Sequence, residues 1–318
     1  MDLRQILYFV RVYEERSFTK AAGRVNVVQP ALSRQIAALE VELGSILFIR
    51  GSKGITPTST ATILYQRVNP LLRDFASIRE EIRSLANVNV VGSIACGFPP
   101  TYNRFVTGKA LMEFSTLYPD VQITVVEAFS GKLTELVKNG ELDFALGARP
   151  AESSGLVTEF EFAQEVALVC GEPVAGPSFQ RCILSELTGI KLLLASPEHV
   201  IGKQVKEHID SGMLRPSKVM YLGSSPAMMD LIKSAGWCGI SPVAGLLEES
   251  DRSDLYIYPI DRSVLEYRLS LVRAGDRPLS QAASAFLQIA KRYSDRIQPV
   301  WQAVLLNQTA HFEKASEL

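Results

Sequence analysis

The stretch QPALSRQIAALEVELG, residues 29–44, decides the fold of the N-terminal part of the chain. It predicts a helix from Gln29 to about Leu43, because proline is tolerated in a first helical turn and Gly44 favours a helix end. One face of this helix is apolar and predicts burial: Leu32, Ile36, Leu39 and Leu43. The opposite face carries small or hydrogen-bonding side chains: Gln29, Ser33, Arg34 and Ala37.

The polar face of this predicted helix can enter the major groove of DNA without a steric clash. Arginine pairs with guanine edges or phosphate, and glutamine pairs with adenine edges. Two shorter helices are predicted before it, at residues 3–13 and at residues 18–25, and Ser17 can cap the second. This order is typical of a helix-turn-helix. The alternative is a plain three-helix bundle whose polar face contacts only water.

A β-hairpin is predicted directly after these helices. Apolar residues 46–49 lead into the basic, glycine-rich segment RGSKG at residues 50–54, and Ile55 and Thr56 follow. A hairpin beside a recognition helix forms a wing. Arg50 and Lys53 would then reach phosphates or the minor groove.

Residues 58–88 repeat apolar side chains at alternating spacings of three and four. The positions are Ala61, Leu64, Val68, Leu71, Phe75, Ile78, Ile82 and Leu85. This heptad pattern predicts a helix that pairs with a second copy as a coiled coil, with a bend rather than a break at Pro70. The alternative is a helix that packs on the body of its own chain.

Charge is unevenly distributed along the chain. The 318 residues carry a formal net charge of −1, but residues 1–58 hold eight Lys and Arg against five Asp and Glu, a net +3. A basic end on a slightly acidic body fits a nucleic-acid-binding arm attached to a part with another role. We expect a cytoplasmic protein, because no apolar run of about 18 residues occurs and the N-terminus does not resemble a signal peptide.

After residue 89, strands and helices alternate. A β-α-β-α-β pattern over residues 90–147 recurs over 191–241, and 156–170 and 255–273 are predicted to cross between the two halves. The predicted fold class is α/β multidomain, with a two-lobed body closed by a helix at 280–296. In such folds a ligand lies between the lobes, where helix N-termini can bind an anion. The candidate contacts are Thr101, Tyr102, Ser130, Ser196, Ser224 and Ser225, with Arg149 to pair with a carboxylate of a small anionic metabolite.

The sequence contains no recognisable catalytic or metal-binding motif. The histidines His199, His208 and His311 lack ligand spacing, and no GxSxG motif occurs. We therefore expect no enzyme, no metal and no cofactor. The four cysteines form no CxxC pair and predict buried free thiols: Cys96, Cys170, Cys182 and Cys238. The alternative is a redox-sensing protein in which Cys96 or Cys238 has a lowered pKa.

Residues 1–60 are similar to the DNA-binding domain of LysR-type transcriptional regulators. The matching stretches are DLRQILYFV, SFTKAA, QPALSRQIAALE, LG, LF-x-R and K-G-x-x-P-T. The resemblance implies a winged helix-turn-helix. It assigns groove reading to Gln29, Pro30, Ser33 and Arg34, and backbone contacts to Thr19, Arg50 and Lys53. The chain departs from the family pattern with Val28 for Ser, Pro57 for Leu, and Thr60-Ala61 for Ala-Gly.

Weaker similarity extends over the body, in YPDVQITVVEAFSGKLTELVKNGELDFAL (118–146) and LIKSAGWCGISP (231–242). It implies the effector domain of the same family, which has the fold of periplasmic ligand-binding proteins. It also implies dimerisation through the linker helix and, often, tetramers. We expect a winged helix-turn-helix at 1–58, a linker helix at 59–88, an effector-binding domain at 89–300 and an uninterpreted tail at 301–318.

The expected partners are double-stranded operator DNA, a small-molecule effector, further copies of the chain and, for an activator, RNA polymerase, with no membrane. Two alternatives remain beside redox sensing. One is a regulator that needs no effector. The other is a solute-binding protein or enzyme joined to an unrelated helical N-terminus.

Overall fold

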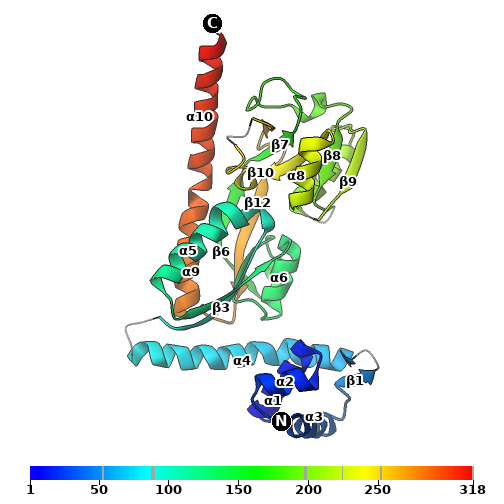
Figure 1. Cartoon of the computed structure of the whole chain (residues 1–318), viewed down its shortest axis with the longest axis vertical. Coiled ribbons are helices and arrows are strands. Elements are labelled where there is room, and N and C mark those ends of the chain that lie inside the picture. The colour runs from blue at the N-terminus through cyan, green and yellow to red at the C-terminus, as the bar shows by residue number, and fades with distance from the viewer. Residues whose placement is uncertain (52–53, 87–89, 197–198, 224, 251–252, 317–318) are drawn as a thin grey trace. The chain divides into compact units, whose positions relative to one another are not determined.

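The structure is a computed structural model that describes residues 1–51, 54–86, 90–196, 199–223, 225–250 and 253–316 (Figure 1). Its contacts divide the chain into two compact units. The N-terminal unit comprises Met1–Val88 with Asn139–Glu141, and the C-terminal unit comprises Asn89–Lys138 with Leu142–Leu318.

The N-terminal unit contains three short helices, a hairpin and one long helix. Its elements are α1 (Leu3–Glu15), α2 (Phe18–Arg24), α3 (Gln29–Leu43), β1 (Phe48–Gly51), β2 (Gly54–Pro57) and α4 (Ser59–Ala86). Local signals set the helix ends. Ser17 caps α2 by accepting a hydrogen bond from the N–H of Lys20, and α3 ends at Gly44, whose φ is 61°. The order of helices and hairpin predicted from the sequence is confirmed.

Apolar residues from all these elements form the core of the N-terminal unit. Its members include Phe9, Leu32, Ile36 and Leu39, each at most 1% exposed. Phe48 of the hairpin packs against Phe9 with ring centroids 5.6 Å apart. The apolar face predicted for α3 is therefore buried, except for Leu43, which is 38% exposed at the end of the helix.

Helix α4 has two halves with different surroundings. Thr58 caps its start by accepting a hydrogen bond from the N–H of Ala61 at 3.1 Å, and the helix continues through Pro70 without a break. Ala61 and Val68 belong to the core of the N-terminal unit, so the first half packs on its own chain. In the second half the apolar stripe is 56–63% exposed: Leu71, Phe75, Ile78 and Ile82.

The C-terminal unit has two lobes, each built on a five-stranded sheet. The order in the first lobe is β4-β3-β5-β12-β6 and in the second β11-β7-β10-β8-β9. The first-lobe strands are β3 (Gly92–Phe98), β4 (Val121–Glu127), β5 (Phe144–Gly147), β6 (Leu156–Gln164) and β12 (Tyr267–Ala274). The second-lobe strands are β7 (Val166–Cys170), β8 (Lys191–Leu194), β9 (Lys218–Tyr221), β10 (Trp237–Pro242) and β11 (Tyr256–Ile260).

The sheets are parallel in their repeated β-α-β parts. Strands β3, β4 and β5 are parallel, as are β8, β9 and β10, whereas β6, β7, β11 and β12 pair in antiparallel fashion. The chain passes from the first sheet to the second between β6 and β7, and it returns between β11 and β12. The prediction that residues 156–170 and 255–273 cross between the lobes is confirmed.

Helices cover these sheets. They are α5 (Gly108–Leu117), α6 (Ser130–Lys138), α7 (Val200–Asp210), α8 (Ser225–Ser234), α9 (Gln281–Asp295) and α10 (Ile297–Ser316). Short helical turns occur at η1 (Pro100–Tyr102), η2 (Asn103–Thr107), η3 (Glu152–Ser154), η4 (Leu184–Glu186) and η5 (Val243–Gly245). Helix α9 confirms the closing helix predicted at 280–296.

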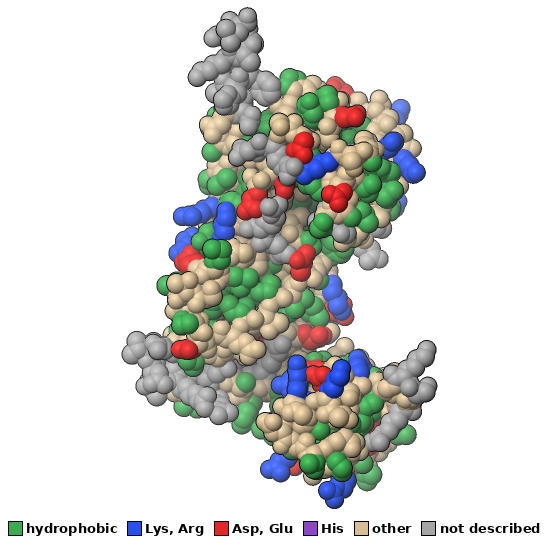
Figure 2. Space-filling view, viewed as in Figure 1, with side chains coloured by type: hydrophobic (Ala, Val, Ile, Leu, Met, Phe, Trp, Pro, Cys, Tyr) green, Lys and Arg blue, Asp and Glu red, His purple; other side chains and the backbone are tan. Residues whose placement is uncertain are grey.

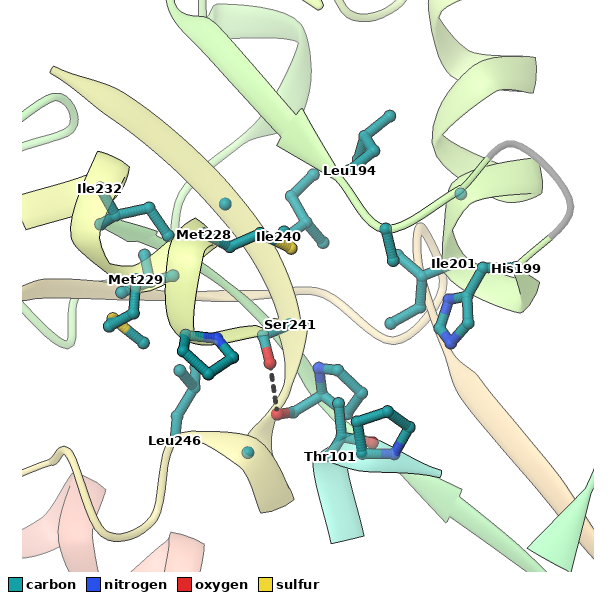
Figure 3. Close-up of a pocket in the computed structure, with 18 of the residues that line it drawn as sticks. Thr101, Leu194, His199, Ile201, Met228, Met229, Ile232, Ile240, Ser241 and Leu246 are labelled. Carbon is teal, nitrogen blue, oxygen red and sulfur yellow. Dashed lines mark hydrogen bonds between the residues drawn. The ribbon is translucent and has the colours of Figure 1, made fainter. Parts of the chain in front are cut away.

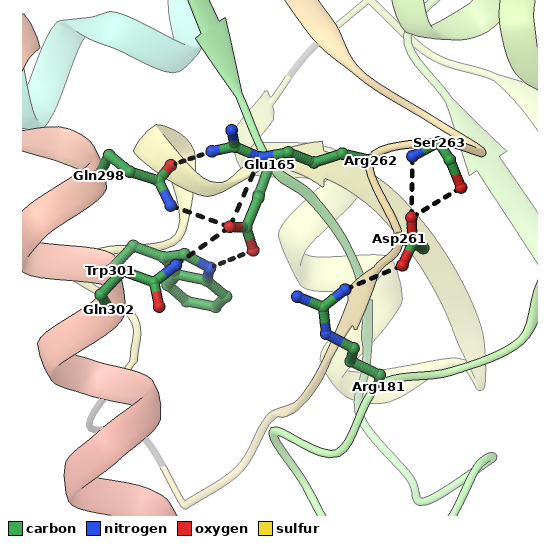
Figure 4. A network of polar contacts seen from close by, with 8 residues as sticks. All are labelled: Glu165, Arg181, Asp261, Arg262, Ser263, Gln298, Trp301 and Gln302. Atoms are coloured by element: carbon green, nitrogen blue, oxygen red, sulfur yellow. Dashed lines mark hydrogen bonds and ion pairs between the residues drawn. The ribbon is translucent and has the colours of Figure 1, made fainter.

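The last helix, α10, is anchored at the crossings between the lobes (Figure 4). Glu165, between β6 and β7, is buried and accepts hydrogen bonds from Gln298 Nε2 at 2.9 Å and Trp301 Nε1 at 3.0 Å. Gln302 Nε2 donates a third at 3.1 Å. Arg262, on the returning segment, lies 3.6 Å from the same carboxylate. Trp301 is fully buried, so the start of the segment that the sequence left uninterpreted packs on its own chain as part of a helix.

Candidate nucleic-acid interface and ligand cavity

Helix α3 presents a polar face on the side opposite its core residues. Pro30 and Arg34 are exposed, and Gln29 and Ser33 are half-buried. Val28, just before the helix, is 69% exposed and makes no side-chain hydrogen bond as a cap. Lys and Arg side chains also lie on the visible face of the N-terminal unit (Figure 2). A helix with short side chains, one amide and one guanidinium on its exposed face can lie in a major groove.

The hairpin is fixed directly to α3. Oε1 of Glu40 accepts hydrogen bonds from the backbone N–H of Leu47 at 2.7 Å and of Phe48 at 3.2 Å. The two strands pair antiparallel, up to the pair Gly51 and Gly54. Because a carboxylate on α3 holds the start of the hairpin, the wing keeps a set position beside the helix.

The predicted backbone contacts are distributed over α2 and the hairpin. Thr19 is exposed in the first turn of α2. Arg50 lies on β1, but its side chain is outside the described part of the chain, and Lys53 lies outside the described residues altogether. The fold thus brings a helix-turn-helix and a wing into one small unit, as the sequence predicts.

A cavity of about 370 Å³ lies where the second lobe meets the first (Figure 3). Most of its wall comes from the second lobe and is apolar: Leu194, Ile201, Met228, Met229, Ile232, Ile240 and Leu246. The first lobe contributes Pro100, Thr101 and Phe129. Among the lining residues that the structure describes there is no Lys or Arg, and the acids are Asp230 and Glu249.

Aromatic and hydroxyl groups occupy the first-lobe side of the cavity. The ring of His199 stacks on Tyr267 with centroids 5.6 Å apart and meets the edge of Phe129 at 5.4 Å. Burial lowers the pKa of His199 to about 4. Burial raises the pKa of Tyr267, and the neighbouring Thr101 hydroxyl opposes this effect. Both hydroxyls are buried beside each other, and in the described structure neither makes a hydrogen bond of good geometry.

Of the effector contacts predicted from the sequence, the structure places Thr101 on the cavity wall. Tyr102 is fully buried, and its hydroxyl accepts a hydrogen bond from Gln164. Ser130 is buried at the start of α6. Neither Tyr102 nor Ser130 lines the cavity, and Ser196 does not line it either. The side chain of Ser225, at the start of α8, and the whole of Ser224 lie outside the described residues.

Arg149 differs most from its predicted role. Its side chain is 74% exposed and pairs with Glu161 on β6, with Nε and Oε1 3.6 Å apart, and it does not line the cavity. A carboxylate on β6 therefore takes the place expected for the ligand. His199 lines the cavity although its spacing was weighed only for metal binding, and the apolar wall was not predicted because its residues have the spacing of ordinary core positions.

The cysteines are buried free thiols, as predicted. Burial raises the pKa of Cys96. Cys170 and Cys238 lie opposite each other on β7 and β10, and a hydrogen bond from Cys170 lowers the pKa of Cys238. Among the described residues, no group of His, Cys, Asp or Glu could hold a metal ion. No helix in the described part of the chain is long and apolar enough to cross a membrane.

The fold and these two sites define a winged-helix DNA-binding protein with a two-lobed sensor-like body. Residues 3–62 match the family described as bacterial regulatory helix-turn-helix protein, lysR family, and residues 89–295 match the LysR substrate binding domain. The chain therefore belongs to the LysR family of DNA-binding transcription regulators, and it is not an enzyme.

Curated relatives agree with this family. The hydrogen peroxide-inducible genes activator of Haemophilus influenzae is 23% identical over 300 residues, covering 94% of this chain and 98% of its own. The nitrogen assimilation regulatory protein nac of Escherichia coli is 25% identical over 291 residues, covering 90% and 94%. The probable cat1 operon transcriptional activator of Acinetobacter lwoffii is 30% identical over 245 residues, covering 73% and 77%.

Solved structures share the fold along nearly the whole chain. A full-length OxyR variant from Pseudomonas aeruginosa aligns with 94% of this chain and 95% of its own, with a TM-score of 0.70 and 19% identity. CbnR in complex with its target DNA aligns with 92% and 100%, with a TM-score of 0.61 and 18% identity. At these identities the likeness establishes the two-domain architecture.

Proposed function

We propose that this regulator binds operator DNA as a homodimer and that a small molecule in the interlobe cavity controls the binding. The observation that carries the first part is the polar face of α3, which leaves Gln29, Pro30, Ser33 and Arg34 on the side away from the core. The second part is supported by a cavity of about 370 Å³ at the junction of the lobes, because sites for small molecules are enclosed and mostly apolar.

Two kinds of DNA contact are proposed. Arg34 pairs with a guanine edge and Gln29 with an adenine edge, while Pro30 and Ser33 pack against the floor of the groove. The remaining predicted contacts bind backbone phosphates, which set position but not sequence: Thr19, Arg50 and Lys53.

A second copy of the chain covers the exposed stripe of α4. Leu71, Phe75, Ile78 and Ile82 are spaced by four, three and four residues and are more than half exposed. Such spacing fits the seam of a coiled coil, and pairing directs two recognition helices at a two-fold related operator. Tetramers form when two such dimers associate.

The protein acts in the cytoplasm, where a bacterial operator is found. Two of the relatives above are named activators, which favours contact with RNA polymerase as the route by which this regulator acts on transcription. A redox response is a second candidate, favoured by the lowered pKa of Cys238 opposite Cys170. In that case Cys238→Ser abolishes the response without changing DNA affinity.

The test of DNA recognition begins by selecting bound fragments from a random DNA library with the full-length protein. Arg34→Ala should then bind the selected operator about 10- to 100-fold more weakly, because one bidentate base contact contributes about 1–3 kcal/mol. Arg215→Ala removes the same charge from an exposed position of the C-terminal unit and should bind like the unmodified protein. Equal affinity of Arg34→Ala and Arg215→Ala would overturn the assignment of α3.

A further inference from the structure

We propose that the cavity takes an uncharged, mostly hydrocarbon ligand. This inference rests on the proposed function, in which the same cavity holds the effector. It replaces the anionic effector that helix N-termini and Arg149 predict from the sequence. Two independent features of the cavity carry it: its wall and its charge.

The wall is built for hydrocarbon. Leu194 of β8, Ile201 of α7, Ile240 of β10 and Leu246 after η5 surround the space, and α8 adds Met228 (Figure 3). Aliphatic side chains exclude water and gain from contact with apolar ligand surface. Methionine side chains are flexible, so this wall can adapt to ligands of different outline.

The charge of the cavity disfavours an anion. None of the described lining residues is Lys or Arg, whereas two of them, Asp230 and Glu249, are acidic. The nearby ammonium of Lys233 is shared between Glu249 at 3.9 Å and Asp254 at 4.0 Å. His199 adds no positive charge near neutral pH, because burial lowers its pKa to about 4. A ligand carboxylate would lose its hydration here without gaining a cationic partner.

The test uses N-phenylnaphthylamine, an uncharged dye that becomes fluorescent in apolar sites, as the reporter on the full-length protein. Naphthol and naphthoate then compete with the dye at neutral pH, where naphthol is uncharged and naphthoate is an anion on the same ring system. We expect naphthol to displace the dye at concentrations at least about tenfold lower than naphthoate.

Matched variants locate the binding. Met228→Trp fills the cavity and should abolish dye binding, whereas Met112→Trp, at a 73% exposed position of α5, should leave it intact. Met229→Trp replaces Met228→Trp if that variant does not fold, as judged by circular dichroism.

Three results would overturn the inference or its basis. No dye binding, or naphthoate displacing the dye as well as naphthol, overturns the ligand class. Dye binding that survives both cavity-filling variants overturns the cavity as the effector site, and with it the second half of the proposed function. DNA affinity, measured on the same samples, remains a separate test of the first half.

Discussion

The polar face of α3 and the interlobe cavity are built in opposite ways. The first is the exposed side of a single helix, with polar side chains a few residues apart. The cavity is lined by apolar side chains from β8, α7, α8 and β10, which are distant in the sequence. DNA is a long polyanion and is bound by an open surface that offers hydrogen bonds and positive charge. A small molecule is bound by excluding water from most of its surface, so the two sites need different neighbours.

The largest effect on DNA affinity is expected from breaking the proposed pairing of α4, because it joins the two DNA-binding surfaces of the dimer. Phe75→Glu places like charges on both helices of the proposed coiled coil, so the dimer should dissociate. Each N-terminal unit then binds one half-site alone, without the gain from a linked second contact. We expect affinity for the selected operator to fall about 100-fold. Sedimentation velocity measures the dimer, and fluorescence anisotropy measures the affinity.

A control for this prediction lies on the same helix. Ile63 is 61% exposed in the first half of α4 but stands outside the heptad stripe. Ile63→Glu should therefore leave both mass and DNA affinity unchanged. If Phe75→Glu remained a dimer, the pairing of the second half of α4 would be refuted.

A smaller effect, on the free energy of unfolding, should report on His199 in the wall of the interlobe cavity. Burial lowers the pKa of His199 from 6.5 to about 4, so the folded protein excludes a proton that the unfolded chain binds. The free energy of unfolding should therefore fall as the pH drops through about 6.5 toward 4, by about 2 kcal/mol at pH 5 for this one group. Urea unfolding at several pH values measures the slope. His199→Gln should show a shallower slope, and parallel slopes would contradict the burial of a neutral His199 as the cause.

The smallest effect concerns the wing. Lys53→Ala should weaken binding to every DNA sequence several-fold and flatten the salt dependence by about one unit of slope, because one phosphate contact is lost. Lys132→Ala, at an exposed position of α6, removes the same charge from the C-terminal unit and should keep the full slope. A change of sequence preference in Lys53→Ala would mean that the wing reads bases.

The same contrast explains how far the sequence could predict each site. Helix α3 carries both a core face and the proposed DNA face. The helical period therefore separates Leu32 and Ile36 from Gln29 and Arg34 without any knowledge of the fold. The heptad of α4 shows the limit of prediction from residue spacing. Spacing identifies an apolar stripe, but only the fold shows that Ala61 packs on its own chain while Phe75 is exposed.

The cavity could be predicted only as a location between two lobes. Its wall consists of residues such as Leu194 and Ile240, which have the spacing of ordinary core residues, and whether they border a space depends on packing across strands. The role expected of Arg149 failed for a similar reason. Its partner Glu161 stands on β6, beyond the strand that separates β5 from β6 in the sheet, and the sequence alone does not bring these two residues together.

The anchoring of α10 determines where the chain can be cut. The match to the family's second domain ends at residue 295, yet three donors to Glu165 lie after it, on Gln298, Trp301 and Gln302. A fragment that stops at the family boundary would lose these three hydrogen bonds to the Glu165 carboxylate, each contributing about 1.5–3 kcal/mol, together with the burial of Trp301. Fragments made for crystallisation or for a biosensor should extend past Gln302, and an affinity tag at this end belongs beyond α10.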